Sequence, residues 1–290
     1  MSPELFADLN NWIGRSEHAI DHCSLILARR IAAMLDRDPE TVNAGDPLPP
    51  GWQMALFTPL IRQSDLRDDG HAQAEALIPP VPLPRRMLGG RRSWFHLPIP
   101  IGAAVERQSE IVAIEPKQGR SGALILVTLR HTIRCTGETE AAIIEEQDSI
   151  FREEASGGPA KPQPASRPAS AGPLRPEFAT TLVTDPRLLF RYSAIGFNTH
   201  RIHYDQPYAT GNEGYPGLIV NGGLATLLLI DLFEREVGRP VASIETRNKG
   251  AIICGRPVRL CGAAEPDAPG HWRLWIENED SRILLEAKST

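Results

Sequence analysis

The segment FNTHRIHYDQPYA, residues 197–209, gathers side chains that can exchange protons near neutral pH. It contains Asn198, His200, His203 and Asp205 between aromatic residues. An imidazole has an unperturbed pKa of about 6.5, so it serves as acid or base near neutrality, and a nearby amide or carboxylate can hold a water molecule. The segment therefore indicates an acid–base site, with a polar surface loop as the alternative.

The tripeptide NGG at 221–223 opens a stretch that is apolar on almost every face up to Phe233. This pattern predicts a buried helix over 218–238. Backbone N–H groups at the start of a helix have no intrahelical acceptor and attract negative charge. Gly222, between Asn221 and Gly223, is therefore the candidate donor to a developing oxyanion; glycines that serve only close packing are the alternative.

Composition argues against several classes of protein. A net charge of -5 gives no electrostatic reason to expect nucleic acid or an anionic membrane as a partner. The four cysteines form no CxxC pair and have no histidine at metal-ligand spacing, so we expect no metal and no redox cofactor. The first 18 residues lack the features of a secretory signal, and no run of 18 apolar residues occurs, which predicts a cytoplasmic location.

A segment rich in Pro, Ala, Ser and Gly, residues 153–177, divides the chain. It contains too few large apolar residues to pack, so we interpret it as a linker between an N-terminal domain, 1–152, and a C-terminal domain, 178–290. Each half reads as one helix and an antiparallel sheet, which predicts an α+β fold.

Apolar spacing predicts the individual elements. In the first half these are a helix at 22–38, strands at 91–99, 103–116, 122–137 and 141–153, and a hairpin turn at 117–122. In the second half they are a strand at 187–196, the helix at 218–238, and strands at 240–252, 256–264, 271–279 and 283–289.

The segments RYSAIGFNTHRIHYDQPYA and EGYPGLIVNGG resemble the signature of MaoC-type hotdog hydratases. Within these the chain is most similar to the group of itaconyl-CoA and mesaconyl-CoA hydratases and mitochondrial 3-hydroxyacyl-thioester dehydratases. PPVPLPRRMLGG, GRSGALILVTLRH and EEQD resemble the degenerate N-terminal hotdog of the same group. The resemblance implies a double hotdog, in which each half wraps a curved sheet around a central helix, with catalysis in the second half.

The resemblance also implies site residues. The family's water-holding Asp and His are five residues apart, which corresponds to Asn198 and His203, with Ala209 at the family's small residue. Asn198 departs from the pattern, because an amide orients water but accepts no proton as a carboxylate does. His200 occupies a position where the family has asparagine, and Asn221-Gly222-Gly223 replaces His-Gly-Pro.

The implied activity is reversible hydration of an enoyl-CoA, most closely itaconyl-CoA or mesaconyl-CoA to citramalyl-CoA. Coenzyme A would be part of the substrate, no separate cofactor is expected, and a homodimer is compatible but not required. Arginines are candidates for the CoA phosphates or a second acyl carboxylate: Arg85, Arg86, Arg191 and Arg201. The alternatives are a dehydratase of longer straight chains, a hotdog thioesterase using Asp231, and a non-catalytic acyl-CoA-binding protein.

Overall fold

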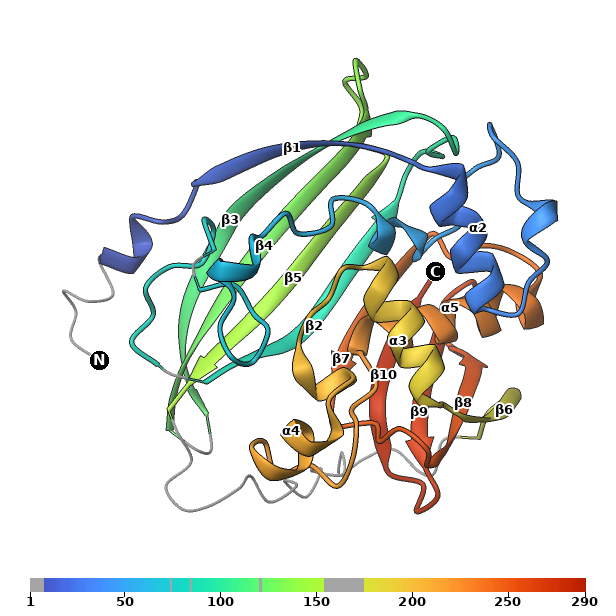
Figure 1. The fold of residues 1–290 in the computed structure, drawn as a ribbon. Coiled ribbons are helices and arrows are strands. Elements are labelled where there is room, and N and C mark those ends of the chain that lie inside the picture. Colours follow the sequence, from blue (N-terminus) through green and yellow to red (C-terminus); the bar gives the residue numbers. More distant parts are fainter. Residues whose placement is uncertain (1–7, 74, 84, 120–121, 154–174) are drawn as a thin grey trace.

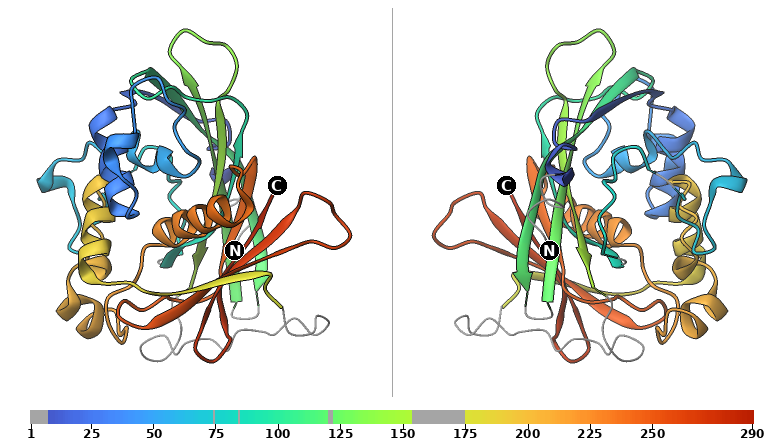
Figure 2. Two further views of the ribbon diagram at one scale, coloured as in Figure 1. Left: turned by 90° about the vertical axis from the view of Figure 1, so that its right-hand side faces the viewer. Right: turned by 90° about the vertical axis from the view of Figure 1, so that its left-hand side faces the viewer.

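A single antiparallel sheet runs through the molecule (Figure 1). The computed structural model describes residues 8–73, 75–83, 85–119, 122–153 and 175–290. Ten strands within these residues pair in the order β1-β3-β4-β5-β2-β7-β10-β9-β8-β6. Figure 2 shows α2, α3 and α5 on the same face of this sheet, with α5 nearest to the strands. The α+β class expected from the sequence is confirmed.

The first half contributes five strands to the sheet. These are β1 (Ser16–His22), β2 (Arg85–Phe95), β3 (Ala104–Gly119), β4 (Gly122–Cys135) and β5 (Ile143–Arg152). From the outer edge inward their order is β1-β3-β4-β5-β2. The four predicted strands correspond to β2–β5, and β3 and β4 form the predicted hairpin, with Gly119 opposite Gly122. The sequence analysis did not predict β1.

The second half repeats this arrangement. Its strands are β6 (Phe178–Val183), β7 (Ser243–Asn248), β8 (Pro257–Ala264), β9 (Trp272–Asn278) and β10 (Ile283–Ser289). From its outer edge inward the order is β6-β8-β9-β10-β7, the same pattern as in the first half. Strands β7–β10 were predicted and β6 was not. The two halves are therefore related in topology, as their element order indicated.

The halves meet where β2 pairs with β7. A β-bulge interrupts β2 between Leu88 and Gly90. A side chain at Gly90 would bring its Cβ within 2.6 Å of the Thr246 carbonyl oxygen, so the close approach of the two strands requires glycine. Because the bulge inserts one residue, Arg86 and Arg91 lie on the same face of β2.

The helices differ in how they cover the sheet. They are α2 (Leu25–Met34), α3 (Pro186–Ile195), α4 (Gln206–Gly211) and α5 (Gly222–Val237), with short 3-10 helices η1 (Pro39–Thr41), η2 (Trp52–Ala55), η3 (Gln63–Asp65) and η4 (Arg201–His203). Helix α5 packs along β8 and β9 and is buried on most sides, as predicted. Helix α2 lies within the predicted 22–38 but packs against α3 and η2. None of the helices in the described ranges has the length and apolar character needed to span a membrane.

Among the described residues of the first half, no long helix therefore runs along the middle of its inner face. Near its far end, Leu77 packs with Ile114, Ile125 and Phe151 in a separate small core. At mid-length, adjacent strands instead carry a polar row at paired positions: Ser109, His131, Glu145 and Ser93. This half has a partly polar interior facing α3.

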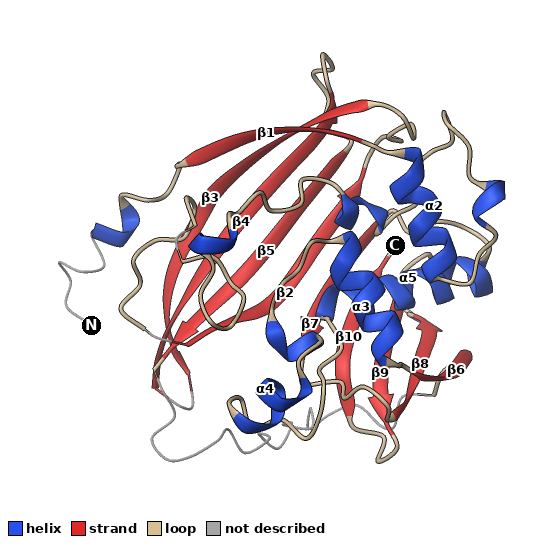
Figure 3. Cartoon of the chain, in the orientation of Figure 1, coloured by secondary structure: helices blue, strands red, loops and turns tan. Residues whose placement is uncertain are grey.

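The predicted strand at 187–196 is wrong, because these residues form helix α3 (Figure 3). The Asp185 side chain caps the helix by accepting a hydrogen bond from Leu188 N at 2.9 Å, and Pro186 occupies its first turn. Leu189, Tyr192 and Ser193 form its buried face, with the three- and four-residue spacing of a helix. The aromatic residues suggested a strand, but the capping residues determine the helix.

The predicted linker falls mostly outside the described residues, which omit 154–174. On its two sides the chain is paired in the sheet: β5 ends at Arg152 and β6 begins at Phe178. Glu177 N also donates to the Gly262 carbonyl at 2.8 Å. The domain boundary at 152 and 178 remains a prediction.

Candidate active site

The end of α3 sets the direction of the polar segment that follows. Asn198 N donates to the Ser193 carbonyl at 2.8 Å, and Phe197 has φ 48°, the left-handed conformation in which helices commonly terminate. Glycine usually occupies such a position, and a phenylalanine there is strained. The strained residue lies directly before Asn198, the first predicted site residue.

Asn198 is exposed and forms a turn with the residues after it. Its Oδ1 accepts a hydrogen bond from His200 N at 3.0 Å. This bond occupies one lone pair of the amide oxygen and leaves the second for a water molecule. The sequence analysis assigned water binding to this oxygen, and that assignment remains a prediction.

His203 is buried, with 8% of its surface exposed. Its Nδ1 is 2.7 Å from the Ile219 carbonyl oxygen. A carbonyl only accepts hydrogen bonds, so Nδ1 carries the proton and Nε2 is left with a lone pair. Burial lowers the pKa of His203, although the Ile219 carbonyl raises it, so the ring is a neutral base near neutrality.

A loop from the first half reaches this site. The His71 ring lies 4.1 Å from the His200 ring between centroids, and His200 lies 5.4 Å from His203. Asp69 Oδ1 is 3.4 Å from His71 Nδ1. Sequence reasoning missed His71 and Asp69, because nothing in the spacing of DDGHA links it to a segment about 130 residues away.

His200 lies between the other two imidazoles. Burial lowers its pKa to about 3, and the nearby His71 and His203 add to that effect. His200 is therefore neutral at physiological pH. Among the described residues, no group of three histidine, cysteine or acidic side chains has the arrangement of a metal site.

Asp205 has a structural role in the same segment. It caps α4 by accepting a hydrogen bond from Tyr208 N at 3.1 Å. Its other oxygen accepts two hydrogen bonds from Arg201, at 3.0 and 2.9 Å. Asp205 therefore holds α4 and the preceding turn together.

The start of α5 lies next to these groups. Asn221 is the N-cap residue and is 3% exposed. Its Nδ2 donates to Ser193 Oγ at 3.5 Å, and its side chain makes no capping hydrogen bond. Ser193 therefore contacts both Asn198, through its carbonyl, and Asn221, through its hydroxyl. The N–H groups of Gly222 and Gly223 head the helix without a side-chain cap.

The two glycines differ in their surroundings. A Cβ on Gly223 would lie 2.1 Å from the Tyr192 hydroxyl, so α3 and α5 approach too closely here for any side chain. A Cβ on Gly222 would meet the Asn248 side chain at 3.4 Å, an ordinary contact. Close packing explains Gly223 and does not explain Gly222.

Two of the four predicted arginines, Arg201 and Arg86, are engaged in ion pairs. Arg201 bridges Asp205 and Asp68, with its Nη1 3.0 Å from Asp68 Oδ1. Arg86 Nη1 is 2.6 Å from Glu75 Oε1, and its Nε donates to Ser149 Oγ at 3.4 Å. The side chain of Arg85 lies outside the described part, and Arg191 is exposed on α3. Arg201 lies in the histidine segment, whereas Arg86 lies on β2.

A buried polar group lies beside α3 on the inner face of the sheet. Glu145 accepts hydrogen bonds from Ser93 at 3.2 Å and Gln53 at 3.4 Å, and its Oε1 is 3.4 Å from Arg91 Nε. Burial raises the pKa of Glu145, but Arg91 and His131 outweigh it and keep the carboxylate charged. Burial raises the pKa of Tyr192, near Arg91 and Glu145, to about 12, so its hydroxyl stays neutral. Sequence reasoning missed this group.

Two buried side-chain oxygens in this region, Gln53 Oε1 and Asn221 Oδ1, have no hydrogen-bond partner among the described residues. Arg91 Nε makes no hydrogen bond there either, and its contact is the ion pair with Glu145 at 3.4 Å. Tyr192 lies between this polar group and the start of α5, since a Cβ on Gly223 would lie 2.1 Å from its hydroxyl.

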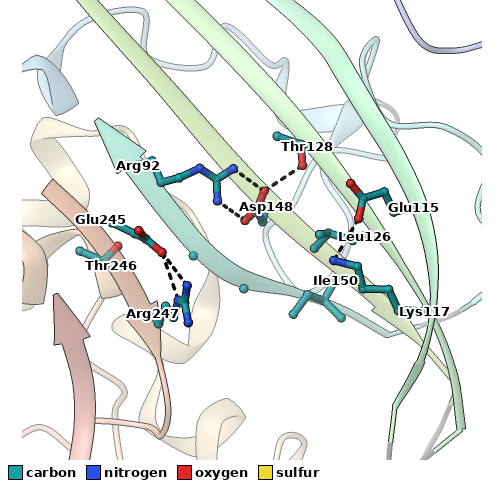
Figure 4. A pocket seen from close by; sticks show the side chains of 12 residues that line it. Arg92, Glu115, Lys117, Leu126, Thr128, Asp148, Ile150, Glu245, Thr246 and Arg247 are labelled. Atoms are coloured by element: carbon teal, nitrogen blue, oxygen red, sulfur yellow. Dashed lines mark hydrogen bonds and ion pairs between the residues drawn. The ribbon is translucent and has the colours of Figure 1, made fainter. Parts of the chain in front are cut away.

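A separate cavity of about 420 Å³ lies on the other face of the sheet (Figure 4). Arg92 and Asp148 form a double hydrogen bond there at 2.7 and 3.0 Å. Glu245 pairs with Arg247, and Glu115 with Lys117. Because Arg92 alternates with Arg91 along β2, this cavity faces away from α3, and its charges are already neutralised in pairs. It is not the acid–base site.

Comparisons with known proteins identify the family of the chain. A family model described as hydroxyacyl-thioester dehydratase type 2 matches residues 51–254. Mesaconyl-C4-CoA hydratase from Chloroflexus aurantiacus is 41% identical over 266 residues, which cover 90% of this chain and 91% of that protein.

Two solved structures establish the fold. A MaoC-like dehydratase superposes with a TM-score of 0.71 at 14% identity, covering 97% of this chain and 99% of the other. A Mycobacterium tuberculosis protein described as having a double hotdog fold gives a TM-score of 0.59 at 15% identity, covering 96% and 95% of the two chains. The predicted double hotdog is confirmed.

Proposed function

Because the chain belongs to the hydroxyacyl-thioester dehydratase type 2 family, we propose that it adds water reversibly across the double bond of an enoyl-CoA thioester. One observation carries the proposal in the site itself. His203 is buried and neutral, and its Nδ1–H donates to the carbonyl of Ile219, three residues before the start of α5. A base with a free Nε2 therefore lies beside a helix N-terminus. Addition of water to the double bond of an enoyl thioester requires both, a base for the water and N–H donors for the thioester oxygen.

In this proposal, Nε2 of His203 takes one proton from a water molecule held by Asn198 Oδ1. The water oxygen bonds to the β-carbon, and the electrons of the double bond move toward the thioester oxygen. The N–H of Gly222 donates to that oxygen while it carries the negative charge. Delivery of a proton to the α-carbon completes the hydration, and the same steps in reverse dehydrate the product.

We infer that the acyl group ends in a second carboxylate, as in mesaconyl-CoA or itaconyl-CoA. The inference rests on the 41% identity to a protein named mesaconyl-C4-CoA hydratase. The partly polar interior beside Tyr192 supports it, because a carboxylate is expensive to desolvate without polar partners. Arg86 is the first candidate for this carboxylate, since its partner Glu75 is 38% exposed and can move to solvent. Arg201 is the second and is less suited, because it already bridges two acidic side chains.

The thioesterase alternative is disfavoured by the contacts of Asp231. This carboxylate on α5 accepts a hydrogen bond from Arg37 Nε at 2.8 Å and lies 3.2 Å from Arg235 Nε. Two arginines thus neutralise it at a distance of about two turns from the helix start. It is a structural ion pair and has no free oxygen directed at a thioester.

The test is a panel of acyl-CoA substrates followed by loss of the enoyl-thioester absorbance, with free thiol measured in parallel. We expect mesaconyl-CoA or itaconyl-CoA to be hydrated with a higher kcat/KM than crotonyl-CoA or longer straight-chain enoyl-CoAs. A preference for long straight chains would favour the longer-chain dehydratase. Thiol release without loss of the double bond would favour the thioesterase and contradict the proposal.

An arginine substitution tests the acyl carboxylate separately. Arg86→Met should narrow the preference for dicarboxylyl substrates by about 2–4 kcal/mol, the contribution of a buried charged contact. Arg130→Met is the matched control, because Arg130 also pairs with a carboxylate, Glu146, at 2.7 Å. If Arg86→Met keeps the wild-type preference for dicarboxylyl substrates, Arg86 does not bind the acyl carboxylate. The proposed hydration reaction would be unaffected by that result.

A further inference from the structure

The loop that carries His71 brings a second imidazole to the site. His71 stacks near His200, and His200 lies against His203. The side chain of His71 is 42% exposed, yet its Nδ1 is buried and lies 3.4 Å from Asp69 Oδ1. This contact is an ion-pair distance without a hydrogen bond, because Asp69 Oδ1 accepts instead from His71 N at 2.8 Å. The exposed part of the ring is therefore the part away from Asp69, which includes Nε2.

Hydration moves two protons, one from water and one to the α-carbon. An amide neither gives nor takes a proton at neutral pH, so Asn198 performs neither transfer. If His203 acted alone, it would have to take a proton from water and then deliver a proton to the α-carbon from the same nitrogen. A second acid–base group in the site removes that requirement.

We propose that the Asp69–His71 pair is the second acid–base group, so that His203 accepts the proton of water and His71 delivers a proton to the α-carbon. The inference rests on the proposed hydration. One O–H bond breaks toward His203 Nε2 as the C–O bond forms, and the N–H bond at His71 Nε2 breaks as the α C–H bond forms. His203 has then gained one proton and His71 has lost one. Transfer of a proton from His203 to His71 restores the protonation state that each ring had before the reaction.

The loop that carries His71 is held against the polar segment by backbone contacts and not by the imidazole ring. Gly70 has φ +90°, and a Cβ there would lie 1.8 Å from the Thr199 carbonyl oxygen. Thr199 Oγ1 donates to the Gly70 carbonyl at 2.6 Å, and Arg201 N donates to the Asp69 carbonyl at 3.0 Å. Replacing the His71 ring therefore leaves the loop attached to the polar segment.

The charged groups around His71 come from both segments. Asp69 is adjacent on its own loop and is paired with Arg67 at 2.7 Å. His200 and His203 face it from the other segment, where Arg201 binds the neighbouring Asp68. His71 is thus the imidazole that lies beside a carboxylate, whereas burial lowers the pKa of His203 and keeps that ring neutral.

The experiment compares His71→Gln and Asp69→Asn with wild type in the hydration assay. We expect His71→Gln to lower kcat at least about 100-fold with little change in KM, and Asp69→Asn to lower it about 10-fold. The pH profile of kcat should change shape in His71→Gln, because one of the two proton-transfer groups is removed. Added imidazole should restore part of the rate of His71→Ala, which loss of a merely structural contact does not allow.

His18→Gln is the matched control, because His18 also lies beside a carboxylate, with Nε2 3.5 Å from Glu106 Oε2, but on β1. It should retain the wild-type rate and pH profile. Circular dichroism and melting temperatures verify that each variant is folded, and Asp69→Asn keeps the inference testable if His71 variants are unstable.

The outcomes separate this inference from the proposed function. If wild type hydrates none of the panel, the proposed function fails. If wild type is active and His203→Ala is inactive while His71→Gln keeps the wild-type rate and pH profile, only the role of His71 is overturned. Loss of rate in His71→Ala without any rescue by imidazole likewise overturns it.

Discussion

At the scale of single residues, the tautomer of His203 decides what the site can do. The Ile219 carbonyl fixes the proton on Nδ1, so Nε2 is the only ring nitrogen able to accept a proton from water. Asn198 contributes position alone, because its amide holds water without taking a proton. In the proposed reaction His203 accepts the proton and Asn198 positions the water, and the two residues are five positions apart in the same segment.

Removing either side chain should reduce turnover strongly. We expect His203→Ala to lower kcat by about 100-fold or more, since it removes the base, and Asn198→Ala to cost a similar factor through lost positioning. Steady-state kinetics with the best substrate of the panel measure both. Near-full activity of folded His203→Ala would contradict the mechanism.

The burial of His203 also sets the acid limit of activity. Its pKa is lowered below the ordinary 6.5, first by burial, so the ring stays neutral as the pH falls through 6.5. The base is active only when neutral, and the rate should therefore decline only at pH values below 6.5. A profile of kcat/KM against pH checks this, and an acid limb centred above 6.5 would contradict it.

At the scale of elements, the close contact between α3 and α5 constrains the site. Gly223→Ala would push a methyl group to 2.1 Å from the Tyr192 hydroxyl, so we expect destabilisation by about 1–3 kcal/mol. Gly222→Ala is the neighbouring control and should be close to neutral in stability, because its Cβ would meet Asn248 at 3.4 Å. Denaturant unfolding measures both.

A second substitution tests the cause. In Gly223→Ala with Tyr192→Phe the hydroxyl is gone, and the nearest atom becomes the ring Cζ at 3.2 Å. The double variant should therefore recover part of the lost stability. Equal destabilisation in the single and double variants would mean that the Tyr192 hydroxyl is not the obstacle.

The sequence predicted elements well where burial produces a regular pattern. Helix α5 and strand β9 contain runs of apolar residues that the core buries, and strands β7, β8 and β10 alternate between buried and more exposed positions. Helix α3 was missed, because RLLFRYSAIG has the aromatic residues of a strand and its capping by Asp185 was not weighed. His71 could not be predicted, since a bond between the Thr199 side chain and the Gly70 backbone brings it to the site, and no residue pattern encodes that contact.

At the scale of the whole molecule, buried histidines link stability to pH. Burial lowers the pKa of His131 to about 4 from the ordinary 6.5, and its Nδ1 is hydrogen-bonded with Ser109 at 2.8 Å. The unfolded chain therefore binds a proton there that the folded protein excludes between these two pH values. Stability is fully present above 6.5 and should be lost as the pH falls toward 4.

Protonation of His131 in the unfolded chain should lower the free energy of unfolding by up to about 3 kcal/mol as the pH falls from 6.5 to about 4. The ordinary pKa of glutamate, about 4.3, lies at the lower end of this range, so the slope between about pH 5 and 6.5 reports mainly on histidines. Denaturant unfolding at several pH values measures the slope, and His131→Gln should reduce it. An equal slope in the variant would mean that another group is responsible.

The matched strand orders of the two halves, β1-β3-β4-β5-β2 and β6-β8-β9-β10-β7, have an evolutionary consequence. In an assembly of two identical chains, every substitution appears twice and must suit both copies. Here the halves are joined in one polypeptide, so each is free to change alone. Within the described residues, the first half carries the short helix α2 and the loop that bears His71, while the second carries the long helix α5 and His203. A site that takes one histidine from each half, each in different surroundings, can arise only where the two halves differ in sequence.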